Sequence, residues 1–546
     1  MSSKTTNPTN LTGNPGRRSA RIGRIPAWGL LAALAIVGAY FASRTGSEIP
    51  AANGTGTGPE FAAIEGFVKS EMAAQRIPGL ALGIVKDNRV IYLRGFGEAD
   101  GSGREVTPQT PFIIGSLSKS FTALAIMQLV EAGKVDLDAP VQRYLPWFRV
   151  ADEDASAAIT VRHLLNQTSG LSAKTGRSFQ GNGDTSDRAL EEAVRKLASA
   201  SLTAPAGEKY QYSTINYSVL GLIVQSVSGD TYEGYIQSEI FDPLQMRNAF
   251  TSQAEAEQQG LASGYNYWFG RPRTADLPQN RGLVPAGYLI ASAEDMTHYL
   301  IAQINGGRYG DAAVLSPAGL DSLHQPAVKT PSADTSYAMG WFVGPLNEIP
   351  AVHHQGETFN FHANAVLIPT SRTGVIVLMN AQNSLDLFTN NRMGTIAEGV
   401  TSILEGREPP SPPSNTINFV AYAALFGVVV VQARAVVHSA QGLRSRRVET
   451  GRVGRRTRIA LSLALSLGWA FFIYILVPKQ FGLPLLVVAQ GFPDFAYVLF
   501  CSAVFAAGWG MVKAIWAYSL PQSRGNVVPG GSETRELPLG PSARAS

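Results

Sequence analysis

The chain has 546 residues, more than one compact core usually holds, so we expect one large unit with accessory segments. Charged residues make up only 16% of the chain and the mean hydropathy is +0.03, which excludes a mainly disordered protein and indicates membrane segments. The single cysteine, Cys501, excludes an internal disulfide, and no histidine and cysteine cluster has the spacing of a zinc site. We therefore expect neither a metal nor a cofactor.

The N-terminal region has the pattern of a signal anchor. Residues 1–24 form a basic tail without an acid, and residues 25–43 form an uncharged run long enough to cross a bilayer. A cleavable signal peptide is the alternative, because Val37-Gly38-Ala39 offers small residues suited to processing. Residues 44–59 read as a linker to an exported domain under either interpretation.

Three further apolar runs lie near the C-terminus. Residues 434–458, between the first two runs, carry eight arginines and one acid, which the positive-inside rule assigns to the cytoplasm. Because each spanning helix carries the chain to the other side of the membrane, residues 478–494 then form an external loop and residues 519–546 a cytoplasmic tail. The predicted transmembrane helices are residues 417–433, 459–477 and 495–518.

The positive charge gathers in the segments that this topology places in the cytoplasm. Residues 1–26, 434–458 and 519–546 hold 16 of the 45 basic residues and 3 of the 41 acidic ones, so the rest of the chain is acidic on balance. The basicity is therefore a topology signal and an attraction to the anionic lipid bilayer. Nucleic-acid binding loses its support.

The predicted spanning helices have no ionisable residue in their interiors, because Asp494 and Lys513 lie at boundaries. Intramembrane charges usually mark a transport pathway, so the pattern argues against a transporter. We expect a multi-pass protein of the cell membrane, with its central domain on the extracytoplasmic (periplasmic) side and the helices as its anchor. Docking of a membrane-protein partner is the alternative role for these helices.

The central region predicts an α+β fold. Residues 60–408 read as one domain, and the proline-rich residues 409–416 as a spacer before the membrane. Strand-like pairs lie at both ends of this domain, with mostly helical sequence between them. Such an order predicts an antiparallel sheet built from both chain ends with an inserted helical region. The strand pairs are residues 80–86 with 89–95, and residues 360–368 with 374–380.

A Ser-x-x-Lys unit, Ser116 to Lys119, precedes a nearly all-apolar helix at residues 121–130. The serine then falls at a helix N-terminus, where the dipole favours developing negative charge, and the i to i+3 spacing puts Lys119 on the same face. A buried amine in its deprotonated form could accept the hydroxyl proton. A capping serine beside a surface lysine is the alternative.

The segment Pro111 to Ala123 resembles the active-site segment of class C-type β-lactamases and penicillin-binding proteins. Later segments resemble that family in the same order, namely residues 159–171, residues 205–207 with 210–221, and residues 285–307. The resemblance implies a β-lactamase/transpeptidase-like fold. It also implies a covalent serine hydrolase that acts on a small-molecule, peptide or cell-wall substrate.

The resemblance assigns the catalytic roles to Ser116, Lys119 and Tyr212, although an isolated tyrosine more often serves packing. It places the oxyanion hole at the backbone N–H groups of Ser116 and Glu357. The family's usual Tyr-x-Asn reads Tyr212-Ser213-Thr214 here. Thr214 thus replaces a carboxamide that commonly binds the amide of the substrate, which disfavours β-lactam recognition.

His354-Gln355-Gly356 stands where the family usually has Lys-Thr-Gly, and it is similar to the His-x-Gly form of esterases and D-aminopeptidases. The resemblance thus adds His354 and Gly356 to the substrate-binding residues. Because strand side chains alternate between faces, only one of His353 and His354 can face the pocket, and a structural histidine is the alternative. An imidazole carries little positive charge at pH 7, so we expect substrates without a nearby carboxylate to be preferred.

An exported class C-like domain followed by three membrane helices also resembles prodrug-activating peptidases of the colibactin-maturation type, which process an acylated D-asparagine prodrug. Residues 263–288 support this subgroup, whereas Thr214 and Leu283 depart from it, and Asn360 is the remaining candidate for amide recognition. A D-amino-acid peptidase, a D-aminopeptidase or D,D-carboxypeptidase, and an inactive penicillin-binding-like sensor or scaffold stay open as alternatives.

Overall fold

The structure is a computed structural model. It describes residues 51–56, 58–179, 183–277, 279–332, 334–384, 392–411, 416–445, 452–482 and 485–519. The described residues belong to one compact unit, Ile49–Ser546. The predicted basic tail and signal anchor lie outside the described residues, as do residues 446–451 of the arginine-rich loop and residues 520–546.

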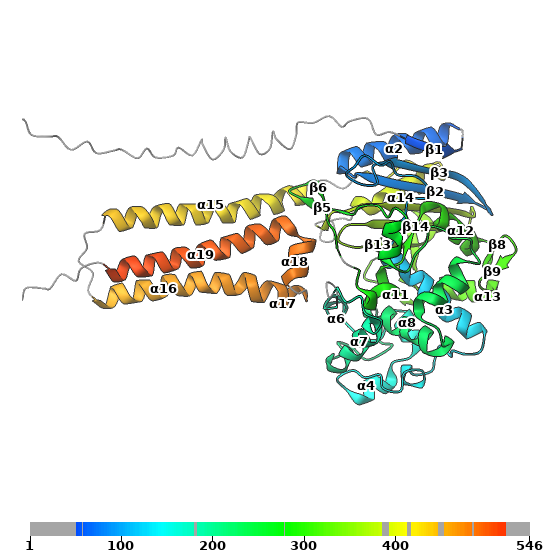
Figure 1. The fold of residues 1–546 in the computed structure, drawn as a ribbon, viewed down its shortest axis with the longest axis horizontal. Helices are drawn as coiled ribbons and strands as arrows, with labels where there is room; N and C mark the ends of the chain where they lie inside the picture. The colour runs from blue at the N-terminus through cyan, green and yellow to red at the C-terminus, as the bar shows by residue number, and fades with distance from the viewer. Residues whose placement is uncertain are drawn as a thin grey trace, which may run out of the picture. The chain divides into compact units, whose positions relative to one another are not determined.

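A nine-stranded sheet forms the centre of the domain, with strand order β1-β3-β2-β15-β14-β13-β12-β11-β10 (Figure 1). All of its pairs are antiparallel, and β2 pairs with β15, which joins the two chain ends as the sequence predicted. The strands are β1 Ala51–Thr55, β2 Gly79–Lys86, β3 Arg89–Gly97, β10 Val328–Lys329, β11 Ser336–Tyr337, β12 Phe342–Leu346, β13 Ile349–Glu357, β14 His362–Ile368 and β15 Thr373–Met379.

The two faces of this sheet are covered by different helices. Along β15, Ile376 belongs to the larger core and Val377 to the smaller one, because successive strand side chains point to opposite faces. Helix α12 packs on the first face, and α2 with α14 on the second. These helices are α2 Pro59–Gln75, α12 Ala293–Ile304 and α14 Thr395–Leu404. The α+β fold with an antiparallel sheet is confirmed.

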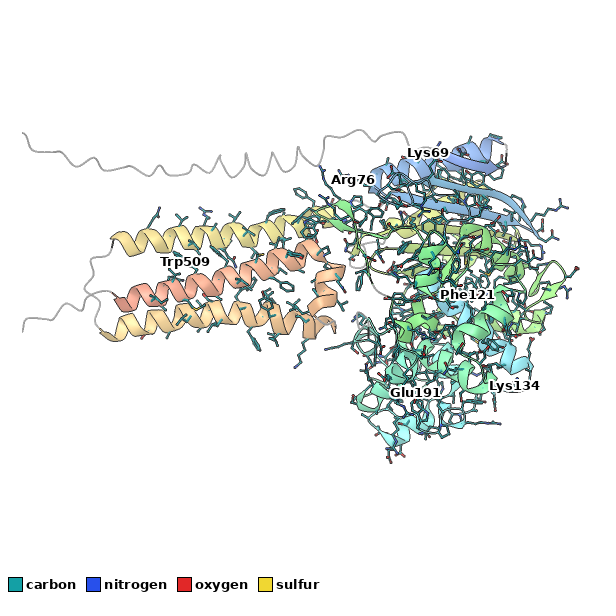
Figure 2. The ribbon with its side chains drawn as sticks, viewed as in Figure 1. Lys69, Arg76, Phe121, Lys134, Glu191 and Trp509 are labelled. Carbon is teal, nitrogen blue, oxygen red and sulfur yellow. The ribbon has the colours of Figure 1, made fainter. Side chains whose placement is uncertain are left out.

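The inserted region is mostly helical and centres on α3 Ser118–Glu131, which is buried along nearly its whole length. Phe121, labelled in Figure 2, belongs to α3. Its ring stacks on that of Tyr299 with centroids 4.0 Å apart. The other helices of the inserted region are α4 Glu153–Ala158, α5 Val161–Leu165, α6 Ala173–Arg177, α7 Ala189–Arg195, α8 Ile215–Ser228, α9 Tyr232–Ile236, α10 Gln253–Gln258 and α11 Val284–Gly287; α13 Pro317–His324 follows α12.

Three short sheets complete the domain. Strands β16 and β5 are parallel, and β5 forms a hairpin with β6. These small sheets were not predicted from the sequence. They are β4 Phe112–Ile113 with β7 Ile290–Ala291, β5 Tyr265–Trp268 with β6 Arg271–Thr274 and β16 Ala381–Gln382, and β8 Arg308–Tyr309 with β9 Ala312–Ala313.

Three C-terminal helices are long and apolar enough to cross a membrane, as predicted. Several of their large apolar side chains, such as Phe419, Leu465 and Ile515, are between 66% and 69% exposed, which is typical of a lipid-facing surface. Helix α18 falls in the predicted external loop and was not anticipated. The three candidate spans are Asn418–His438, Leu463–Gln480 and Pro493–Ile515. The α-helices of this part of the chain are α15 Thr416–Ser445, α16 Arg452–Phe471, α17 Val477–Phe481, α18 Leu485–Gly491 and α19 Pro493–Ser519, and Trp509 of α19 is labelled in Figure 2.

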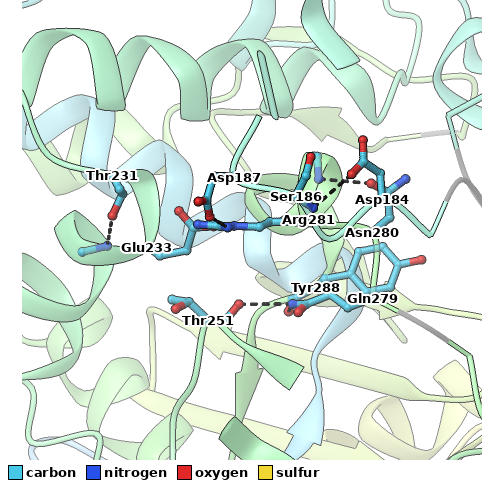
Figure 3. A network of polar contacts seen from close by, with 12 residues as sticks. Asp184, Ser186, Asp187, Thr231, Glu233, Thr251, Gln279, Asn280, Arg281 and Tyr288 are labelled. Carbon is cyan, nitrogen blue, oxygen red and sulfur yellow. Dashed lines mark hydrogen bonds and ion pairs between the residues drawn. The ribbon is translucent and has the colours of Figure 1, made fainter. Parts of the chain in front are cut away.

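An ion-pair network fixes the segment that leads into α11 (Figure 3). The Arg281 guanidinium donates to Glu233 at 2.7 Å and also pairs with Asp187. Arg281 therefore ties α9 to the loop before α7 at the point where the chain enters α11. Helix α11 matters for the site because its Ala286 carbonyl contacts the buried lysine described next.

Candidate active site

Ser116 and Lys119 meet at the start of α3. Ser116 lies in a short 3-10 turn, Gly115–Leu117, directly before the helix, and it is half-buried. Lys119 Nζ lies 2.8 Å from Ser116 Oγ and donates to the Ala286 carbonyl oxygen at 2.5 Å. The structure thus brings together the hydroxyl and the amine that the i to i+3 spacing predicted.

Lys119 is fully buried, and this burial lowers its pKa to about 7. The cause is desolvation, which penalises the charged ammonium. A substantial share of the amine is therefore neutral near pH 7, and a neutral amine can accept a proton. The contact with Ser116 Oγ places this acceptor at the hydroxyl.

Tyr212 lies close to both Lys119 and Ser116, just before α8. Lys119 Nζ is 5.0 Å from the centre of the Tyr212 ring. Burial raises the pKa of Tyr212 well above its usual value, and a hydrogen bond with Ser116 opposes the rise only in part. Tyr212 therefore keeps its phenolic proton at neutral pH. Tyr337 packs edge-on against it at 6.1 Å.

The backbone of β13 approaches the turn at Ser116 very closely. A Cβ atom on Gly356 would lie 1.8 Å from the Ile114 carbonyl oxygen, so only glycine fits at this position. Similarly, Gly115 has φ +54, and a Cβ atom there would lie 2.3 Å from the Glu357 amide nitrogen. These two glycines let the Glu357 amide lie beside the turn that carries Ser116.

The two neighbouring histidines of β13 have different surroundings. His354 is 2% exposed, and its ring centroid lies 6.3 Å from that of Tyr212, whereas His353 is partly exposed. Both rings contact Phe342, with centroids 5.1 Å away for His354 and 5.8 Å away for His353. His354 Nδ1 lies 2.6 Å from the Gln355 carbonyl oxygen, so the proton resides on Nδ1. Burial, with a smaller effect of Lys119, lowers the pKa of His354 to about 3. His354 is therefore a neutral imidazole beside Lys119 at physiological pH.

The two other side chains that the sequence suggested for substrate binding, Thr214 and Asn360, differ in how free their polar groups are to meet a substrate. Thr214 is the partly exposed N-cap of α8, and its side chain makes no capping hydrogen bond within the described residues. Asn360 is only 4% exposed. Its amide nitrogen donates to the Ala275 carbonyl at 2.8 Å, and its amide oxygen accepts from Thr358 Oγ1 at 3.0 Å. These contacts give Asn360 a role in holding the loop after β13.

Sequence reasoning missed the Ala286 carbonyl and Tyr337. Residues 285–307 were noted only for their resemblance, and a backbone carbonyl carries no side-chain signal. Within the described residues, no group of three or more histidine, cysteine, aspartate or glutamate side chains could hold a metal ion.

Comparison with known proteins shows what this chain is similar to. Putative penicillin-binding protein PbpX from Bacillus subtilis (strain 168) is 29% identical over 305 residues, or 56% of this chain and 71% of that protein. The solved octameric penicillin-binding protein homologue from Pyrococcus abyssi superposes with a TM-score of 0.56 at 28% identity, over 64% of this chain and 78% of that one.

Protein flp from Staphylococcus aureus (strain MW2) is 30% identical over 319 residues, which are 58% of this chain and 62% of that protein. The chain thus spans less than two thirds of the length of this relative. The beta-lactamase family pattern matches residues 64–396, which contain the whole site described above. The chain therefore belongs to the beta-lactamase family.

Proposed function

We propose that the protein is a membrane-anchored serine hydrolase that cleaves an ester or amide bond through an acyl-enzyme. The observation that carries this proposal is the 2.8 Å contact between Ser116 Oγ and the buried Lys119 Nζ. In the proposed first step, Ser116 Oγ attacks the substrate carbonyl carbon and its proton passes to neutral Lys119. Water later attacks the acyl-enzyme and releases the acid.

Tyr212 and the backbone amides have complementary roles in this scheme. The N–H groups of Ser116 and Glu357 stabilise the negative oxygen of the tetrahedral intermediate. Tyr212, which keeps its proton, bonds to Ser116 and can pass a proton to the leaving group as it departs. The leaving alcohol or amine thus takes up the phenolic proton of Tyr212. In deacylation the attacking water gives a proton back to Tyr212, and Lys119 returns its proton to Ser116 Oγ, so that all three side chains regain their starting forms.

We propose that the preferred substrates lack a carboxylate near the scissile bond. A lysine at the position of His354 would supply a fixed positive charge for such a group, whereas the buried imidazole has its pKa lowered to about 3 and stays neutral. The partly exposed Thr214 side chain offers a hydroxyl in place of a carboxamide. Together these two residues favour neutral esters and amides.

A direct comparison of two substrates tests this specificity. We expect kcat/KM for a neutral p-nitrophenyl ester to exceed that for benzylpenicillin by at least about fivefold at pH 7, since the charge pairing worth about 1 kcal/mol or more is missing. Steady-state hydrolysis by the full chain in detergent gives both constants. Faster turnover of penicillin than of the ester would refute the proposed specificity.

We also propose that the hydrolase domain, residues 60–408, lies on the extracytoplasmic side of a cell membrane. The arginines of residues 434–458 favour a cytoplasmic location for that loop. Residues 478–494 then lie on the opposite side, together with the hydrolase domain. The hydrogen bond from Asn266 to the Gln490 carbonyl at 2.7 Å supports this assignment.

A prodrug-activating D-amino-acid peptidase is the narrower alternative. The three C-terminal helices are compatible with that subgroup, but the amide of Asn360 is engaged by Ala275 and Thr358, which disfavours its use for substrate amide recognition. An inactive cell-wall sensor is the other alternative, and the assembled contact between Ser116 and Lys119 argues against it.

A further inference from the structure

The membrane region reaches the hydrolase domain through a short segment that we term the corner, residues 485–494, made of α18 and the start of α19. The corner packs on the loop that directly follows Glu357. A Cβ atom on Gly491 would lie 2.5 Å from the Phe359 ring, and the Phe492 ring meets Phe359 edge-on at 6.5 Å. The corner therefore contacts a residue, Phe359, that lies two positions along the chain from the candidate oxyanion-hole residue Glu357.

Polar contacts hold the corner to the β5–β6 hairpin. The Asp494 carboxylate is 3% exposed, and it accepts from the Phe269 amide at 2.9 Å and from the Tyr422 phenol at 2.7 Å. Trp268 also packs against Tyr497 of α19 at 5.0 Å. Figure 1 shows this hairpin beside the end of α15. A buried carboxylate with these partners fixes the hairpin to both α15 and α19.

The hairpin in turn holds the loop that carries Phe359. The Tyr265 amide donates to the Asn360 carbonyl at 3.1 Å, and the Asn360 side chain donates back to Ala275, just after β6. The loop is thus held between the corner on one side and the hairpin on the other. This packing explains why the amide nitrogen and the amide oxygen of Asn360 are both already hydrogen-bonded.

The chain preceding the corner touches the opposite part of the site. A Cβ atom on Gly482 would lie 2.4 Å from the Lys174 side chain of α6. Two residues further along α6, a Cβ atom on Gly176 would lie 2.7 Å from the Thr214 amide. The connection between α16 and α19 therefore contacts both elements that border the candidate site, α6 beside Thr214 and the loop beyond Glu357.

We propose that the corner completes the substrate site, with Phe492 as a specificity-determining residue for apolar groups. This inference rests on the proposed function. The rings of Phe492 and Phe359 are both partly exposed, so each keeps apolar surface that a substrate can cover. Because the corner begins the span at Pro493–Ile515, this surface lies at the membrane boundary. The favoured substrates are esters or amides with an extended apolar acyl chain that partitions into the bilayer surface.

A chain-length series tests the role of Phe492. The full-length protein in lipid nanodiscs is assayed with p-nitrophenyl acetate and with p-nitrophenyl decanoate, and the ratio of the two kcat/KM values is determined. We expect Phe492→Ala to lower the decanoate-to-acetate ratio about tenfold, as expected when a long chain loses an aromatic contact. Phe492→Leu, which keeps an apolar side chain, should restore most of the ratio.

Phe471→Ala is the matched control, because Phe471 is 54% exposed on the membrane helix α16 and should not affect the ratio. A decanoate-to-acetate ratio in Phe492→Ala within twofold of wild type would overturn the inference, and so would an equal fall in Phe471→Ala. Ser116-dependent acetate hydrolysis by wild type reports the proposed function separately. Its absence would refute that function, whereas its presence with an unchanged ratio would refute only the role of the corner.

Discussion

Replacing Lys119 by methionine should lower ester hydrolysis by about 10³-fold, because the general base that accepts the Ser116 proton is lost. The same substitution should stabilise the folded protein below pH 7. Lys119 is fully buried with a pKa lowered to about 7, whereas a lysine in the unfolded chain has a pKa near 10.4. Methionine fills a similar volume without a charge.

The direction of the pH effect follows from proton binding. Between about pH 7 and 10 the unfolded chain binds the lysine proton and the folded chain does not, so wild-type stability rises with pH in that window. Below pH 7 the folded protein carries a buried ammonium at full cost. Thermal unfolding at pH 6 and pH 9 should therefore show a larger advantage of Lys119→Met at pH 6. A larger advantage at pH 9 would contradict this account of Lys119.

Gly356→Ala should produce the second large effect. The new Cβ atom would lie 1.8 Å from the Ile114 carbonyl oxygen, so β13 must move away from the turn that carries Ser116. That movement displaces the Glu357 amide, and loss of one oxyanion-hole donor typically costs about 10²–10³-fold in kcat. The clash should also destabilise the fold by about 2–3 kcal/mol.

Gly66→Ala is the control for this experiment, because a Cβ atom at Gly66 in helix α2 would meet nothing within 4 Å beyond its chain neighbours and the adjacent backbone of its own helix. An alanine there should keep activity and leave stability equal or slightly higher. Ester hydrolysis and urea unfolding of both variants provide the comparison. Near-wild-type kcat in Gly356→Ala would contradict the proposed oxyanion hole.

Much of the fold could be predicted from local patterns. The strand-like runs at residues 80–86 and 89–95 predicted the β2–β3 hairpin, and the structure pairs Ile84 with Tyr92 there. The spacing of Ser116 and Lys119 predicted their contact, because residues three apart share a helix face. The three membrane helices followed from the length and composition of their apolar runs.

The features that the sequence did not predict depend on long-range contacts. The acceptor for Lys119 is the carbonyl of Ala286, and a carbonyl group looks the same at every position of the sequence. The engagement of Asn360 requires Ala275 to lie beside it, 85 residues away in the chain. Helix α18 has only seven residues, which is too short for periodicity to distinguish it from a loop.

Covalent labelling at Ser116 tests the central claim most directly. A fluorophosphonate probe is incubated with the full chain and with Ser116→Ala, and the labelled peptide is identified by mass spectrometry. Nucleophilic attack by Ser116 predicts one adduct on the peptide that contains this serine, absent from the variant together with ester hydrolysis. Undiminished hydrolysis by Ser116→Ala, or a wild-type protein that hydrolyses no ester and forms no adduct at Ser116, would contradict the proposed mechanism.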